Sequence, residues 1–415
     1  MARTKGSLNK STLAKKNAGV YVMNFEKEIQ GSPITKKSGM GYVNYGSRND
    51  IPNKLLGLYN ESPTHAACIN FGVQSIVAGG IDYEAMALDG SQTVPNYEYS
   101  FDELIRNLAL DFMLFGTYYL QIIKNNDDKT FSFWHIPAEK VRWSPYDEDG
   151  QIMTYWVSND WSAIGLNPPI EIDAFDMRPD TTIERGKPYI YCFRKYSPTM
   201  SYYTSPHYYP AIKAIQAEIE YINFDLKHIV NGFSAAGILT LPECETDEQR
   251  QAIIDNVQRM FQGSSQANSI AITFRSNIED KPVEWTPFSN KGSNVDEYAG
   301  ANQRVINRIL AAHQINDPQL VGLPNLGGTG FNSEGRLLEV AYNVYNKVVG
   351  NYNRQCVIKT INDCFKMNGI DTEIIMKPLR FNDIKGENNA EDTKPNTDAD
   401  DKELTEEKVE EKVEK

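Results

Sequence analysis

The feature that most constrains this fold is a heptad stripe of apolar side chains between residues 210 and 233. Its seven members are spaced 3, 4, 3, 4, 3 and 4 residues apart: Ile212, Ile215, Ile219, Ile222, Leu226, Ile229 and Phe233. This alternation places them on one face of an α-helix. Pro210 suits the first turn of such a helix and Gly232 suits its end. At ~1.5 Å per residue the helix is about 35 Å long.

Two interpretations of this helix are open. It is either an ordinary amphipathic core helix or a helix that packs against copies of itself or a partner helix. In the second case its charged face, with Glu218, Glu220 and Asp225, turns toward a solvent-filled space.

The net charge of −13 is distributed unevenly over the 415 residues. Residues 1–40 hold eight Lys or Arg against two Glu, a net of +6, and residues 382–415 hold 13 acids against six Lys, a net of −7. The body between them therefore carries −12. We expect both polar ends to be disordered, and an acidic body argues against a protein that coats DNA by neutralising phosphates. The polar N-terminus does not resemble a secretory signal.

The first half of the body predicts helices followed by a sheet, an α+β arrangement. Residues 49–81 indicate two helices, the second starting at Ser62-Pro63, and Ser100 with Glu103 forms a capping-box pattern for a third. After Gly116 the apolar period changes to two. We expect a meandering antiparallel sheet with strands at 117–123, 131–135, 141–143, 154–157 and 188–193.

The second half predicts a small insert between long helices. Residues 238–241, 246–261, 269–274 and 283–288 form a β-α-β-β pattern with Thr246 as a helix cap. A helix is expected at 295–316 and a long last helix at 334–367, with a bend at Gly350. The uncharged segment between them, residues 318–333, is rich in Gly and Pro.

No motif for catalysis or metal binding is present. The run Gly327-Gly328-Thr329-Gly330 lacks the Lys-Ser/Thr of a phosphate loop, and neither GxSxG nor HExxH occurs. His65 and Cys68 lie three residues apart, for which we favour a buried Cys beside a His at the rim over a metal pair. His207, His228 and His313 stand alone in the sequence. We therefore expect no enzyme activity, no metal and no cofactor.

Four passages together resemble the portal proteins of tailed bacteriophages, the head-to-tail connector rings of long-tailed and related phages. They are residues 51–56 (IPNKLL) with 62–69 (SPTHAACI); 115–120 (FGTYYL) with 134–141 (WHIPAEKV); 209–212 (YPAI) with 231–233 (NGF) and 237–239 (GIL); and 309–322 with 331–334 (FNSE). The resemblance covers about residues 40–370, and it rests on the order and spacing of these passages.

The resemblance implies a division of the chain into portal regions. These are a basic flexible arm (1–40), an α+β wing (41–209), a first stem helix (210–234), a β-α-β-β clip (235–290), a second stem helix (291–317), a tunnel loop (318–333), a long wing helix with a short helical crown (334–381) and an acidic disordered tail (382–415).

It also implies a ring, usually of twelve copies, at one capsid vertex, assembled in the host cytoplasm. Double-stranded DNA would pass through the ring without sequence-specific contacts, and the partners would be the major capsid protein, the terminase large subunit and a head-tail adaptor or neck protein. No membrane is involved. The alternative is another virion structural or scaffolding protein that oligomerises through its heptad helix.

Four groups of residues follow as candidates. Stem packing is assigned to Ile212, Ile215, Ile219, Ile222, Leu226 and Ile229, and the channel-lining acids are Glu218, Glu220 and Asp225. The tunnel loop contacts DNA through Leu323, Asn325, Gly327, Gly328, Thr329, Gly330, Phe331 and Asn332. Clip contacts to terminase or adaptor are Glu243, Glu245, Asp247, Arg250, Asp255 and Arg259.

Overall fold

The computed structural model describes residues 41–127, 129–175, 183–198, 200–230, 237–242, 246–261, 271–275, 284–287, 295–324 and 335–377. The chain divides into two units, Met1–Lys377 and Pro378–Lys415, and everything described below belongs to the first. The predictions for the basic arm and the acidic tail lie outside the described residues.

Three helices open the described chain: α3 (Ile51–Glu61), α4 (Pro63–Val77) and α5 (Phe101–Phe115). The Ser62 hydroxyl accepts a hydrogen bond from the His65 backbone N–H at 3.2 Å, which caps α4. Ser100 and Glu103 form the expected capping box of α5. The helix starts predicted from the sequence are confirmed.

A six-stranded sheet follows the helices, with strand order β2-β1-β6-β5-β4-β3. Its strands are β1 (Thr117–Lys124), β2 (Phe131–Ile136), β3 (Val141–Trp143), β4 (Thr154–Val157), β5 (Ile170–Ala174) and β6 (Pro188–Arg194). The expectation of an antiparallel meander is wrong, because β5 and β6 pair in parallel and β6 lies between β1 and β5. Strand β5 is absent from the prediction; its short alternating sequence, IEID, is the signal that was available.

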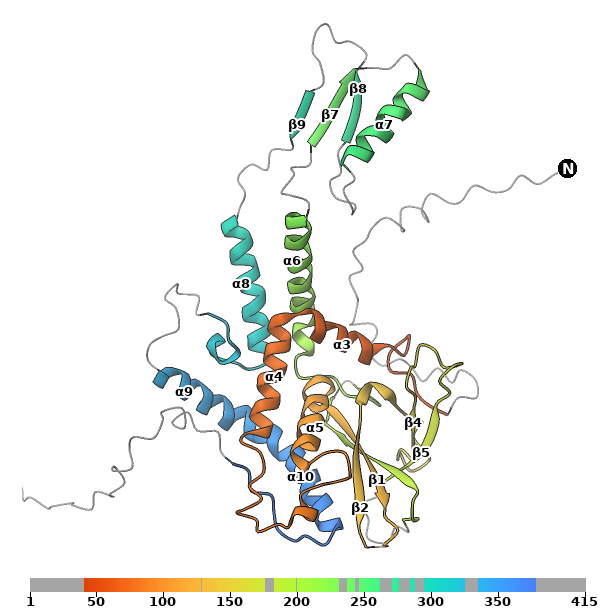
Figure 1. Ribbon diagram of the computed structural model, residues 1–415, viewed down its shortest axis with the longest axis vertical. Coiled ribbons are helices and arrows are strands. Elements are labelled where there is room, and N and C mark those ends of the chain that lie inside the picture. Colours follow the sequence, from red (N-terminus) through yellow and green to blue (C-terminus); the bar gives the residue numbers. More distant parts are fainter. Residues whose placement is uncertain are drawn as a thin grey trace, which may run out of the picture. The chain divides into compact units, whose positions relative to one another are not determined.

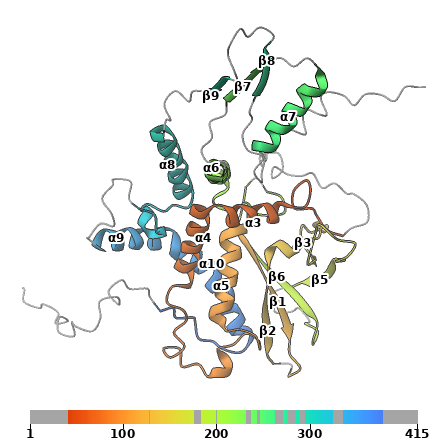
Figure 2. The same cartoon turned by 45° about the horizontal axis from the view of Figure 1, so that its top comes forward.

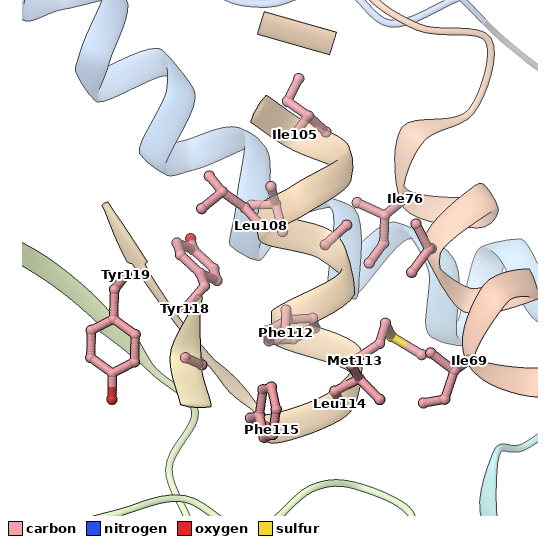
Figure 3. Packing of buried hydrophobic residues seen from close by; sticks show 14 of the residues in the cluster. Ile69, Ile76, Ile105, Leu108, Phe112, Met113, Leu114, Phe115, Tyr118 and Tyr119 are labelled. Atoms are coloured by element: carbon pink, nitrogen blue, oxygen red, sulfur yellow. The ribbon is translucent and has the colours of Figure 1, made fainter. Parts of the chain in front are cut away.

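The core lies between α5, one face of the sheet and the helices α4 and α10 (Asn351–Met367). Figure 3 shows Phe112 and Met113 of α5 reaching toward Tyr118 of the sheet on one side and Ile69 of α4 on the other. Burial of each such side chain contributes about 1.5–3 kcal/mol. The buried Tyr118 hydroxyl is satisfied, since it lies 2.7 Å from Thr360 Oγ1 and donates to the Cys356 carbonyl at 2.8 Å.

A fully buried arginine fixes the start of the described chain to the edge of the sheet. Arg142 on β3 donates to the side chain and the carbonyl of Asn49 and to the carbonyls of Glu139 and Val141. Its guanidinium also lies 4.7 Å from the centre of the Trp161 ring. The Val43 N–H donates to the Trp143 carbonyl at 2.8 Å, so this edge strand is covered.

The long helices of the second half are α6 (Ile212–Val230), α8 (Val295–Ala312), α9 (Gly335–Tyr345) and α10 (Figures 1 and 2). A short 3₁₀ turn, η3 (Tyr209–Ala211), leads into α6, and another, η4 (Pro318–Val321), follows α8. The expected single last helix is interrupted by a π-helical segment, η5 (Asn346–Gly350). Between α10 and Lys377 there is no helix, so a helical crown is not found up to that residue.

The insert between α6 and α8 has the predicted β-α-β-β order. It consists of β7 (Gly237–Pro242), α7 (Asp247–Phe261), β8 (Ala271–Arg275) and β9 (Glu284–Pro287). β7 is the central strand, parallel to β8 and antiparallel to β9. The Thr246 hydroxyl caps α7 by accepting from the Gln249 N–H at 3.3 Å. Across the described chain, no helix is both long and apolar enough to cross a lipid bilayer.

Candidate functional surface: the helix pair α6 and α8 and its surroundings

Helices α6 and α8 contact each other at the ends that enter the core. Ile212 and Ile215 of α6 are buried there, as are Val305 and Ile309 of α8. The first turns of the predicted stem-packing stripe thus pack inside the subunit, and packing between stem helices of different subunits stays a prediction.

Farther along α6 the same heptad stripe emerges from the core. Ile219 is half-buried, whereas Ile222 is 41 % exposed and Leu226 is 55 % exposed. The neighbouring Phe224 is 40 % exposed as well. The structure describes the backbone but not the side chain of Ile229. Among the described members of the stripe, Ile212 and Ile215 fill this subunit's own core, and Ile222 and Leu226 form an apolar surface open to another helix.

Glu218 does not line a channel, and its prediction as a channel acid is wrong. Its side chain is only 5 % exposed. The hydroxyls of Ser62 and Thr64, in the first turn of α4, both donate to its carboxylate. Burial of a carboxylate requires such donors, so Glu218 is a clamp between α6 and the start of α4. Glu220 and Asp225 are exposed and stay candidates for a channel wall.

A groove runs along the contact between α6 and α8. It has a volume of about 580 Å³ and is lined mainly by alanines, among them Ala214, Ala217 and Ala311. Lys213 and Arg308 also line it. The groove therefore combines small residues with positive charge, in contrast to the acids farther along α6.

The segment predicted as a tunnel loop is described only up to Pro324. Within it η4 forms a 3₁₀ turn capped by Asp317, whose carboxylate accepts from the Gln319 N–H at 2.8 Å. Leu323 is half-buried. The other predicted loop residues lie outside the described part of the chain: Asn325, Gly327, Gly328, Thr329, Gly330, Phe331 and Asn332.

A second apolar stripe lies along α9, η5 and the start of α10. Its members are exposed by 42 to 69 % and recur every three or four residues: Leu337, Val340, Val344, Val348 and Tyr352. On the opposite side Tyr345 and Val357 are buried, and Arg354 donates to the carbonyls of Ser75 and Ile76 of α4. One face of this helical unit is thus anchored to the core, and the other is apolar and exposed.

The clip residues predicted to bind a partner are described only in part. Asp247 is exposed, and its carboxylate lies 3.3 Å from the half-buried Arg250 guanidinium. The Gln251 amide donates to the Asp255 carboxylate at 3.0 Å. Glu243, Glu245 and the side chain of Arg259 lie outside the described part of the chain.

The sequence did not reveal a cluster of three histidines at the base of the two helices. His313 after α8 is hydrogen-bonded both to His65 of α4 and to His207 before η3. The prediction of a His at the rim beside Cys68 is wrong, since His65 is fully buried, and so is the view that His207 and His313 stand alone. Among the described side chains, no group of His, Cys, Asp and Glu has the arrangement of a metal site.

Chains in solved structures of gene transfer agent particles have this fold. No protein-family model matches the sequence, and no curated protein matches it. Solved structures do match: a chain in the virion of a native gene transfer agent (GTA) particle shares the fold with a TM-score of 0.51, 15 % identity and coverage of 79 % of this chain and 83 % of that one. A chain in the neck of the empty GTA particle, computed with C6 symmetry, gives 0.52, 16 %, 79 % and 84 %.

A third match is a chain in the neck of the native GTA particle, computed with C12 symmetry. Its TM-score is 0.51, with 15 % identity over 79 % of this chain and 83 % of that chain. At these identities the likeness concerns the fold, which spans most of both chains.

Proposed function

We propose that this chain is a portal protein, which forms a closed ring at one vertex of a phage or phage-like capsid. DNA enters and leaves through the ring, and the chain has a structural rather than a catalytic role. The observation that carries the proposal is the fold shared with chains of a particle neck along 79 % of this chain. The two necks were computed with C6 and C12 symmetry, which favours a ring, and twelve copies are our expectation.

Two exposed apolar surfaces support assembly into a ring. The outer half of α6 carries Ile222 and Leu226, and the α9–α10 stripe carries Val348 and Tyr352, all more than 40 % exposed. Surfaces of this kind are uncommon on monomers. A ring buries both at once, because each subunit presents one face to the neighbour on its left and another to the neighbour on its right.

The distribution of charge suits a channel through which DNA slides. The body carries a net charge of −12, and Glu220 and Asp225 are exposed on α6. Acids repel phosphates, so a duplex passes without being retained, whereas a basic lining binds it. The uncharged loop of residues 318–333 is our candidate for the narrowest point.

The insert is our candidate for the docking site of the other partners. It folds around its own three-stranded sheet and separates α6 from α8 in sequence. We assign to it the terminase large subunit during packaging and the head-tail adaptor afterwards, and to the wing the major capsid protein.

Sedimentation velocity of the purified full-length protein tests the ring. The wild type is expected to sediment as a large closed oligomer, and a Leu226→Asp/Val348→Asp variant as a folded species of much lower mass. Arg106→Asp, at an exposed position of α5 outside both apolar surfaces, serves as the control for a charge change. A wild-type protein that stays monomeric at high concentration contradicts the proposal.

A further inference from the structure

Three of the five histidines of the chain form one hydrogen-bonded row inside the subunit. His65 Nδ1 lies 3.0 Å from His313 Nε2, and His313 Nδ1 lies 2.9 Å from His207 Nε2. Both nitrogens of His313 are therefore used, one for each neighbour. At one end of the row, His65 Nε2 is buried without a hydrogen-bond partner. The row joins α4, the chain entering α6 and the chain leaving α8.

Proton counting limits the charge that this row can hold. Each of its two hydrogen bonds contains one proton between two nitrogens, and each of the two outer nitrogens, His65 Nε2 and His207 Nδ1, can hold one more. Four protons are the maximum with both bonds intact. Three neutral imidazoles already carry three. The intact row therefore accepts at most one additional proton, and a second sets N–H against N–H and breaks a bond.

The surroundings of the row oppose even that first proton. The ring of Tyr208 packs against His65 and His313, with centroid distances of 4.3 and 5.5 Å. Burial is the main cause that lowers the pKa of His65 to about 3 and of His207 to about 4, and it also lowers that of His313. The neighbouring histidines act in the same direction on His65 and His313.

The other titratable groups near the row come from three elements. Lys195, which follows β6, adds to the lowering of the His207 pKa. Glu218 of α6 is held by Ser62 and Thr64, which shortly precede His65 in sequence. The Cys68 thiol, one turn from His65 on α4, has its pKa raised by burial to about 12 and stays neutral. Of these groups, Glu218 is the one carboxyl group, and each of its two oxygens already accepts a hydrogen bond from a hydroxyl.

We propose that the row of His65, His207 and His313 is an acid-sensitive latch that holds the bases of α6 and α8 against α4 and opens when it takes up two or more protons. In the closed state the three rings are neutral and bridge the three segments. Once opened, each imidazole is free to charge in water. The inference concerns the single subunit, so it stands independently of the proposed ring.

The sign and size of the pH effect follow from the proton count. The folded pKa values lie below the ordinary value of 6.5, so the stabilisation is complete above that pH and is lost as the pH falls toward 4. Each imidazole that stays neutral when closed and titrates normally when open raises the opening constant by about 25-fold between pH 7 and pH 5. With at least two such imidazoles, the increase is at least about 600-fold.

Hydrogen exchange of the full-length protein at pH 7 and pH 5, expressed as protection relative to intrinsic rates, measures this opening. Peptides covering residues 60–72 and 305–316 report on the latch, and a peptide covering β1 is the internal reference. In the wild type we expect protection of the two latch peptides to fall by about 600-fold or more while β1 stays protected. In His207→Gln, which removes the half-buried end of the row, the fall should be about 25-fold smaller.

His135→Gln is the matched control, because His135 pairs with Asp111 at 2.8 Å outside the row. It should retain the wild-type fall. If His207→Gln does not fold, His65→Gln removes the other end and carries the same expectation. The proposal is overturned if latch protection does not change with pH, if His207→Gln or His65→Gln loses as much latch protection between pH 7 and pH 5 as the wild type, or if β1 loses protection equally.

Discussion

The replacement of Glu218 distinguishes a structural clamp from a channel-lining acid. Glu218→Ala removes a buried acceptor and leaves the Ser62 and Thr64 hydroxyls at the start of α4 without an acceptor for their protons. A hydrogen bond to a charged group is worth about 1.5–3 kcal/mol, and an unsatisfied buried group costs a similar amount. For each bond, the lost hydrogen bond and the unsatisfied donor that it leaves are the same effect counted from two sides, so they are not added. For the two bonds together we expect a loss of about 3–5 kcal/mol in the free energy of unfolding.

A graded series makes this expectation sharp. Glu218→Gln keeps the shape and one carbonyl acceptor, so its expected loss is about 1–2 kcal/mol. Glu220→Ala removes an exposed acid two residues away on the same helix and should change stability by about 0.5 kcal/mol or less. Urea unfolding followed by tryptophan fluorescence, at one protein concentration for all variants, gives the three values.

The reasoning fails if Glu218→Ala and Glu220→Ala destabilise the protein equally. It also fails if Glu218→Ala lowers the free energy of unfolding by less than about 1 kcal/mol, since the loss of a buried acceptor with two donors should have a larger effect.

Three further changes test other parts of the account. Arg142→Met should lower the free energy of unfolding by about 2–4 kcal/mol in the same urea assay, because the carbonyls of Asn49 and Val141 lose the donor that Arg142 provides. The control, Arg106→Met at an exposed position of α5, should leave the free energy of unfolding almost unchanged. Ile222→Asp should reduce ring formation in sedimentation without loss of helical circular dichroism, and intact rings would exclude this face from the interface. Deletion of residues 325–330 should impair DNA packaging or retention while rings still assemble, and loss of the rings would make the segment architectural.

Local patterns predicted the helices well, because their signals lie within a few residues. The Ser62 cap and the Ser100–Glu103 box each involve side chains three residues from the backbone groups they bind. The sheet was harder, since the parallel pairing of β5 with β6 depends on tertiary packing, for which a local period of two carries no information.

The sequence predicted which face of α6 is apolar, but not which residues of that face are buried in the subunit. The heptad spacing of α6 identified the apolar face, yet spacing does not show that Ile215 enters the core while Leu226 stays exposed. It also does not distinguish Glu218 from Glu220. The histidine row joins residues 106 and 248 positions apart, so no sequence spacing could have indicated it.

The central claim, a ring that conducts DNA, is tested most directly by a cryo-EM map of the purified full-length protein. We predict a closed ring with an axial opening wide enough for a DNA duplex, with Glu220 and Asp225 on its wall and Ile222 and Leu226 in subunit contacts. A map that shows a monomer or an open filament, or that places both acids in contacts between subunits, would contradict it.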